Sequence, residues 1–304
     1  METNSRIVED IRKLAKERRA VILAHNYQIP DVQDIADYTG DSLELSRIAA
    51  GVDCDVIVFC GVTFMAETAY ILSPQKTVLI PDPEAGCPLA DMVDINRFRA
   101  LKAEHPDAFT LCYVNSSAEV KAESDVCCTS ANAVRIVQSL NGVKEILFVP
   151  DRCLGAYVQR VTGKNIILAR GFCPTHHRIQ KEHILKMKEK YPDAVVIVHP
   201  ECNSEVIDIS DHVCSTSQMI KVAKESSAKV FIIGTEEGLL HRLKKENPDK
   251  EFYVPSDVCV CPNMKKTTLE KVLWSLETME HRVTVDEDIR KRASRSLERM
   301  LDYV

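Results

Sequence analysis

The chain has 304 residues, of which 45% are apolar and 28% charged, and its formal net charge is −6 at pH 7. This composition is typical of a soluble globular protein with more than one domain, and the charge argues against a nucleic-acid surface. No apolar run is long enough for a signal peptide or a membrane span. We therefore expect a cytoplasmic protein whose twelve cysteines are thiols, mostly buried, unless a metal holds some of them.

The first 88 residues predict alternating helices and strands. An amphipathic helix over 6–19 precedes "AVILAHNY" (20–27), which is typical of a buried parallel strand. "ADYTGDSLELS" (36–46) predicts a short strand and a helix start, and "VIVFCGVTFMAETAYIL" (56–72) predicts a strand followed by a helix. "TVLIPDPEAGCP" (77–88) predicts a last strand and a loop.

The same order of elements recurs twice more. The strands "AFTLCYVN" (108–115) and "AVVIVHPE" (194–201) follow the first strand at steps of 88 and 86 residues. The alternation predicts an α/β fold of three similar three-layer α/β/α domains, with small parallel sheets around a pseudo-threefold axis. We expect domains at 1–88, 89–174 and 175–262, and a tail at 263–304 whose two helices pack on them.

Cysteine followed by proline occurs once in each repeat, at the closing loop. The three positions are Cys87, Cys173 and Cys261, spaced by 86 and 88 residues. Cys259 stands two residues before Cys261 and is out of this register. If the domains surround one axis, the three in-register thiols converge there. Three converging thiolates suggest a metal, although three buried turns inherited from one duplicated ancestor would give the same pattern.

Two further columns of the repeat hold polar side chains at the end of the first strand. Ligands bind beyond the carboxyl ends of the strands in open parallel sheets, so these columns predict a binding site. The first column is His25, Tyr113 and His199, and the second is Tyr27, Asn115 and Glu201. An aspartate column at 37, 125 and 211 follows in each repeat.

A hydroxyl column begins the next helix of each repeat, at Ser42, Ser130 and Thr216. These residue types cap helices, so capping alone is one interpretation. Helix N-termini also offer free amides and partial positive charge. Three of them aimed at one axis would hold a small, multiply anionic substrate without arginines.

Two kinds of metal centre could be held by the three cysteines. A structural zinc site usually takes four protein ligands, often in local pairs. A [4Fe–4S] cluster normally takes four cysteines, and three would leave one iron open to act as a Lewis acid.

Motifs along residues 20 to 275 resemble the quinolinate synthase (quinolinate synthetase A) family. They include "ILAHNYQIPDVQDIADYTGDSLELS", "LCYVNSSAEVKAESDVCCTSANAV", "GFCPTHH", "IVHPEC", "STSQMI", "IGTEEGLLHRLKK" and "CPNMKKTTLE". The resemblance implies a [4Fe–4S] cluster held by Cys87, Cys173 and Cys261. It also implies condensation of iminoaspartate with dihydroxyacetone phosphate to quinolinate, phosphate and water, on the route to NAD.

The resemblance also implies which residues form the site. Glu201, Tyr27, His25, His199, Tyr113 and Asn115 are the expected catalytic residues. Ser42, Ser130, His176, Ser215 and Thr216 complete the expected substrate-binding set. We expect Glu201 to be the general acid/base, with Tyr27 or a histidine relaying protons. Cys259 is a spare thiol or a redox partner of Cys261 in this interpretation.

Other functions fit part of the pattern. A non-enzymatic iron–sulfur sensor or scaffold that binds a small anion explains the three cysteines, but it does not need the polar strand ends. A different iron–sulfur hydro-lyase acting on a hydroxy acid is a second alternative, and a zinc-bound structural protein is a third. An enzyme that supplies iminoaspartate is a candidate partner, and neither nucleic acid nor a membrane is expected.

Overall fold

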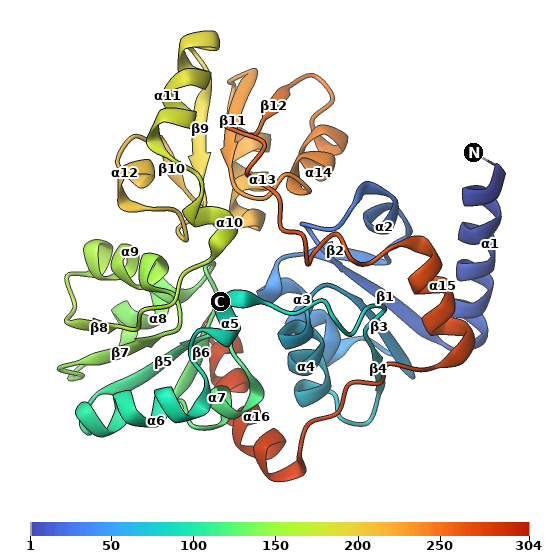
Figure 1. The fold of residues 1–304 in the computed structure, drawn as a ribbon, viewed down its shortest axis with the longest axis horizontal. Coiled ribbons are helices and arrows are strands. Elements are labelled where there is room, and N and C mark those ends of the chain that lie inside the picture. The colour runs from blue at the N-terminus through green and yellow to red at the C-terminus, as the bar shows by residue number, and fades with distance from the viewer. Residues whose placement is uncertain (1, 304) are drawn as a thin grey trace.

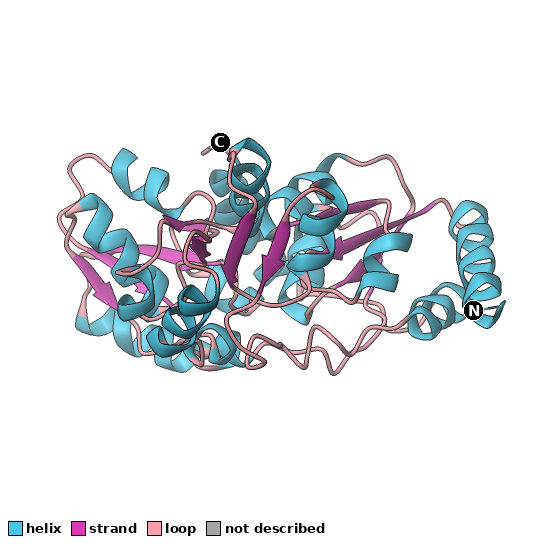
Figure 2. Ribbon diagram, turned by 90° about the horizontal axis from the view of Figure 1, so that it is seen from above, coloured by secondary structure: helices cyan, strands magenta, loops and turns pink. Residues whose placement is uncertain are grey.

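A computed structural model describes residues 2–303 and has three four-stranded parallel sheets. Their strand orders are β2-β1-β3-β4, β6-β5-β7-β8 and β10-β9-β11-β12, so the three sheets share one topology. Figure 1 shows three lobes around a common centre, and Figure 2 shows helices above and below the layer of strands. The predicted fold class is therefore confirmed, and each lobe is called a unit below.

The first unit has strands β1 (Ala20–His25), β2 (Tyr38–Gly40), β3 (Val56–Cys60) and β4 (Thr77–Leu79), with helices α1 (Glu2–Glu17), α2 (Pro30–Ile35), α3 (Ser42–Gly51) and α4 (Thr63–Leu72). The second has β5 (Phe109–Tyr113), β6 (Val126–Cys128), β7 (Ile146–Val149) and β8 (Ile166–Leu168), with α5 (Pro88–Asp91), α6 (Ile95–Glu104), α7 (Ala118–Ala122), α8 (Ala133–Ser139) and α9 (Arg152–Thr162).

The third unit has β9 (Val195–Val198), β10 (His212–Val213), β11 (Val230–Gly234) and β12 (Glu251–Tyr253), with α10 (Pro174–His177), α11 (Lys181–Lys190), α12 (Ser204–Ile207), α13 (Thr216–Glu225) and α14 (Leu239–Glu246). The tail has α15 (Leu269–Thr278) and α16 (Glu287–Leu301). Helices α2, α7 and α12 were not predicted, because four to six residues are too few to show a helical period. The domain boundaries stay a prediction.

The strand order places the site. In each sheet the chain leaves the first strand to one side and returns on the other, so the first and third strands are central neighbours. This reversal opens a crevice at the carboxyl ends of the central strands. The central strands are almost fully buried because helices cover both faces, which explains their continuous apolar sequences.

The aspartate column of the repeat proves to be structural. In each unit its carboxylate accepts a hydrogen bond from a backbone amide of the first strand, at 2.7–2.8 Å. The pairs are Asp37 with Ile22, Asp125 with Thr110, and Asp211 with Val196. These bonds fix the short second strand beside the first and lie away from the strand ends that carry the polar columns.

The tail connects two of the units. Helix α15 packs on α1, and Arg18 Nε donates to the Leu276 carbonyl at 2.8 Å. Helix α16 packs on α7 and β6 of the second unit and on α4 of the first (Figure 1). None of the helices between residues 2 and 303 combines the length and apolar character that a membrane crossing needs.

Candidate active site

A cavity of about 210 Å³ lies where the three units meet, at the carboxyl ends of their first strands. Thirteen of the fourteen predicted site residues line it. They are His25, Tyr27, Ser42, Cys87, Tyr113, Asn115, Ser130, Cys173, His176, His199, Glu201, Thr216 and Cys261. Ser215 is fully buried and is not part of the wall. Each unit thus contributes its strand end, a hydroxyl and a cysteine to one cavity.

The three cysteine loops have a common local geometry. Cys87 and Cys173 have extended backbones, as residues before proline do, and their prolines start α5 and α10. The backbone amides three residues on, at Ala90, His176 and Met264, lie near the thiols and favour their ionised form. Burial raises the pKa of Cys87 to about 12, and the amides oppose this rise because they favour the thiolate.

Cys259 lies in a different environment from Cys261. Its side chain is fully buried in the apolar core of the third unit, which also contains Cys202 and Ile179, and it does not line the cavity. Cys261 does line it. This placement supports the interpretation drawn from the Cys-Pro register and leaves Cys259 as a core residue.

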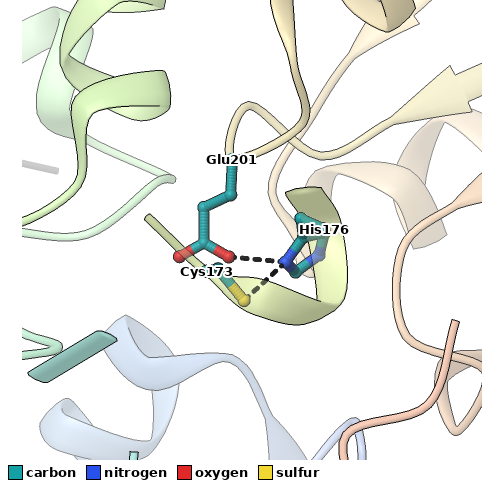
Figure 3. A group of neighbouring side chains, drawn as sticks. All are labelled: Cys173, His176 and Glu201. Atoms are coloured by element: carbon teal, nitrogen blue, oxygen red, sulfur yellow. Dashed lines mark hydrogen bonds and ion pairs between the residues drawn. The ribbon is translucent and has the colours of Figure 1, made fainter. Parts of the chain in front are cut away.

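The chemistry of the donors fits a cluster held by three cysteines. The thiols of Cys87, Cys173 and Cys261 are free of disulfides and come from three units to one cavity. Glu201 Oε1 and Asn115 Oδ1 are buried in the same wall without hydrogen-bond partners among the described residues. A second donor set, Cys173, His176 and Glu201, has its ligand atoms within 4.8 Å of one another and could also hold a metal (Figure 3).

A chain of hydrogen bonds connects Tyr27 to Glu201. The Tyr27 hydroxyl lies 2.5 Å from Thr235 Oγ1, which lies 2.8 Å from His176 Nε2. His176 Nδ1 lies 2.7 Å from Glu201 Oε2 and 3.2 Å from the Cys173 thiol (Figure 3). If Nδ1 donates to the carboxylate, neutral His176 accepts from Thr235, which in turn accepts from Tyr27. Every hydrogen bond in this series is then donated in the direction of Glu201.

The electrostatics of the site distinguish Glu201 from Tyr27. Burial raises the pKa of Glu201, but His176 beside it donates a hydrogen bond that favours the carboxylate and lowers this pKa to about 2. Burial, with Glu201 nearby, raises the pKa of Tyr27 well above its ordinary value. Glu201 is therefore a carboxylate in the resting site, and Tyr27 keeps its proton.

The two histidines of the first column are fixed in one tautomer. His25 Nδ1 accepts from the Tyr27 amide at 3.2 Å, and His199 Nδ1 accepts from the Glu201 amide at 3.3 Å. Their Nε2 atoms therefore carry the protons, and His199 Nε2 donates to Ser130 Oγ at 3.1 Å. Burial lowers the pKa of each to about 3. Both are neutral hydrogen-bond donors to the cavity.

The prediction that Ser42, Ser130 and Thr216 cap helices is wrong. The caps of α3 and α13 are Asp41 and Ser215, one residue earlier, and each forms a capping box. Helix α8 starts only at Ala133, so Ser130 lies in the preceding turn. The physical reason is that the cap must accept amides of the first turn, as Asp41 does from Leu43 and Glu44, although Asp41 also lines the cavity. Ser215 Oγ accepts from Gln218 in this way, and the hydroxyls one residue later line the wall.

Several residues of the site were not predicted. They include Thr235, two buried acids, Asp151 and Glu236, and Arg178, which lines the cavity. The acids were detectable, since each follows the third strand of its unit by two residues ("VPD" and "GTE"). Thr235 gave no signal, because its partners come from distant segments. His177, beside His176, lines a separate groove.

The fold and the site define a class of protein, a three-unit α/β enzyme with a buried site built from one strand end and one thiol of each unit. The family model described as quinolinate synthetase A protein matches residues 9–302. The chain belongs to this family.

Three curated relatives are each named quinolinate synthase. That of Desulforudis audaxviator is 55% identical over 99% of both chains. That of Geobacter sp. (strain M21) is 56% identical over 98% of both chains, and that of Methanosarcina barkeri is 57% identical over 97%. Membership in an enzyme family excludes the non-enzymatic sensor.

Proposed function

We propose that this chain is a quinolinate synthase that condenses iminoaspartate with dihydroxyacetone phosphate to quinolinate, phosphate and water, in de novo NAD biosynthesis. The observation that carries the proposal is the convergence of three Cys-Pro thiols and six strand-end side chains on one cavity. Duplicated units that only packed against one another would not need Glu201, which is buried and has one oxygen without a partner among residues 2–303.

Cys87, Cys173 and Cys261 would hold a [4Fe–4S] cluster, one thiol from each unit. When bound, such a cluster supplies one iron without a cysteine ligand, which acts as a Lewis acid toward substrate oxygen or nitrogen. Because the thiols are buried and have raised pKa values, loading the cluster must release their protons.

Glu201 is the proposed general base. Its lowered pKa keeps it ionised, and the partnerless oxygen is free to accept a substrate proton. After that transfer, Glu201 becomes the acid that returns the proton to a leaving hydroxyl. The hydrogen bonds through His176 and Thr235 would let Tyr27 supply the proton for a second leaving hydroxyl and regain one from a later deprotonation of the substrate.

The remaining wall would bind substrate anions through neutral donors. His25 and His199 present Nε2 protons, and the hydroxyls of Ser42, Ser130 and Thr216 lie on the same wall. Tyr113 and Asn115 would orient the substrate, because the oxygen of the Asn115 amide has no partner within residues 2–303. Neutral donors bind carboxylate and phosphate weakly enough for product release.

The two small substrates are the proposed partners, together with the enzyme that supplies iminoaspartate, because an imine of this kind hydrolyses quickly in water. We also propose a cytoplasmic location. The described cysteines are all free thiols, which agrees with a reducing compartment.

Replacement of each candidate ligand by serine tests the proposal, with Cys259→Ser as the matched control two residues from Cys261. After anaerobic reconstitution, we expect the unsubstituted protein and Cys259→Ser to contain four irons per chain and to form quinolinate from the two substrates. Cys87→Ser, Cys173→Ser and Cys261→Ser should lose iron and activity. Full iron content in Cys261→Ser would contradict the ligand assignment, and a colourless zinc-loaded protein would contradict the cofactor.

A further inference from the structure

Two buried carboxylates occupy equivalent positions in the second and third units and hold equivalent atoms. Asp151 follows β7 by two residues, and Glu236 follows β11 by two residues. Asp151 Oδ2 accepts from the Cys173 amide at 3.2 Å, and Glu236 Oε1 accepts from the Cys261 amide at 3.0 Å. Both carboxylates are fully buried. The same hydrogen bond to a cysteine backbone thus occurs twice, in side chains of different length.

Each carboxylate is itself held by a second amide. The other oxygen of Asp151 accepts from the Leu154 amide at 2.7 Å, at the start of α9. The other oxygen of Glu236 accepts from the Gly238 amide at 2.8 Å. A carboxylate that bridges two amides fixes their separation, so the cysteine loop is tied to the end of the central strand in both units.

Glu236 has an additional connection to the first unit. Lys265 Nζ lies 2.9 Å from Glu236 Oε1 and donates to the Tyr27 carbonyl at 2.9 Å. Gly238 packs so closely on Tyr27 that a Cβ atom there would lie 2.7 Å from the Tyr27 carbonyl carbon. The carboxylate that holds the Cys261 loop therefore also fixes the loop that carries Tyr27.

The first unit lacks this carboxylate. Val62 occupies the position two residues after β3, and within residues 2–303 no carboxylate accepts from the Cys87 amide. The Cys87 loop is held instead through carbonyls, since Thr63 donates to Ala85 at 2.8 Å and Asn263 Nδ2 donates to Gly86 at 2.8 Å. Asn263 follows Cys261 by two residues, so the third loop holds the first.

We propose that Asp151 and Glu236 are positioning residues of the cluster site, each fixing the backbone of one ligand cysteine and so the direction from which its thiol meets the iron. The inference rests on the proposed function, because it assigns Cys173 and Cys261 as ligands. Burial of a carboxylate is unfavourable unless specific donors compensate it. Here the donors are the amides of the cysteine loops, so the carboxylates serve the position of the thiols.

The test compares Asp151→Asn and Glu236→Gln with two controls that lose the same kind of bond elsewhere. Asp125→Asn and Asp211→Asn each alter a carboxylate that holds a strand amide in the same unit, away from the cysteines. The amide side chains keep one acceptor oxygen but present an N–H group to the second amide. Glu236→Asp, which keeps the charge and shortens the reach, is a second variant should Glu236→Gln fail to fold.

The measurement is the rate at which each anaerobically reconstituted holoprotein loses iron to an iron(II) chelator, at a temperature well below its unfolding midpoint. We expect iron loss about tenfold faster in the Asp151 and Glu236 variants, because a hydrogen bond that holds the backbone of a ligand cysteine is lost or weakened. The EPR spectrum of the reduced cluster should also change in them. In the two controls both readouts should stay as in the unsubstituted protein.

Equal rates and unchanged spectra in the Asp151 and Glu236 variants would overturn the inference while leaving the proposed function intact. Equally fast iron loss in the controls would overturn it as well, because general destabilisation would then explain the effect. An unsubstituted protein without a four-iron cluster would overturn both proposals.

Discussion

The first and third units have the same backbone at the site but differ in acid–base chemistry. Both have a histidine at the end of the first strand or directly after it, whose Nδ1 accepts the amide two residues on, and both start the helix after the second strand with a capping box. The residue whose amide donates to this histidine is Tyr27 in the first unit and Glu201 in the third. The pKa of Tyr27 lies far above its ordinary range and that of Glu201 far below. The repeated backbone thus fixes where a side chain lies, and the residue at that position determines whether it gives or takes a proton.

The largest expected effect on kcat/KM comes from replacing Glu201, and it should exceed the effect of replacing Tyr27. Glu201→Gln removes the only ionised group of the column, and we expect kcat/KM to fall by about 10² to 10⁴ with the iron content unchanged. Tyr27→Phe removes a proton donor that acts through Thr235 and His176, so its effect should be smaller. Quinolinate formation and iron content are measured for both variants under anaerobic conditions. A loss in Tyr27→Phe as large as that in Glu201→Gln would show that the units share the acid–base work equally.

The repeat explains how much of the site the sequence could predict. Strands that align in a repeat also align in space, so the columns of His25 and Tyr27 identify strand ends without coordinates. The Cys-Pro spacing likewise distinguishes Cys261 from Cys259, and the structure places only Cys261 on the cavity wall. These predictions need only the order and spacing of residues along the chain, and gene duplication keeps that order and spacing the same in each repeat.

The features that were missed depend on how the units face one another. Thr235 lies between Tyr27 of the first unit and His176 of α10, and no local sequence pattern predicts such a bridge. The caps were placed one residue late, because Ser42 and Thr216 are capping types that follow better-placed caps. Asp151 and Glu236 differ in type and length, so the column they share is visible only after the third strands are superposed.

The first and third units have in common a buried, neutral histidine at the end of the first strand. In the folded protein the pKa of His25 and of His199 is about 3, against an ordinary value of 6.5. Between these values the unfolded chain binds a proton that the folded chain does not, so the free energy of unfolding must fall as the pH falls from 6.5 toward 3. His25→Gln and His199→Gln should each flatten this slope by about 1.4 kcal/mol per pH unit.

Denaturant titration of the thiol-reduced apoprotein at several pH values measures the slope. The double variant should flatten it by the sum of the two single effects, since each histidine is held by its own loop. An unchanged slope in either variant would mean that the histidine is protonated in the folded protein, which would contradict its assignment as a neutral donor.

The smallest expected effect distinguishes the helix cap from the cavity wall in the third unit. Ser215→Ala removes the cap of α13 and should lower the free energy of unfolding by about 1 kcal/mol without changing kcat/KM. Thr216→Val removes a hydroxyl that lines the cavity and accepts from Asn26 at 2.9 Å, so it should raise KM. In the first unit Ser42→Ala should resemble Thr216→Val, because Asp41 is the cap there. If Ser215→Ala raised KM as much as Thr216→Val, the cap itself would contact substrate and the equivalence of the two units at this position would fail.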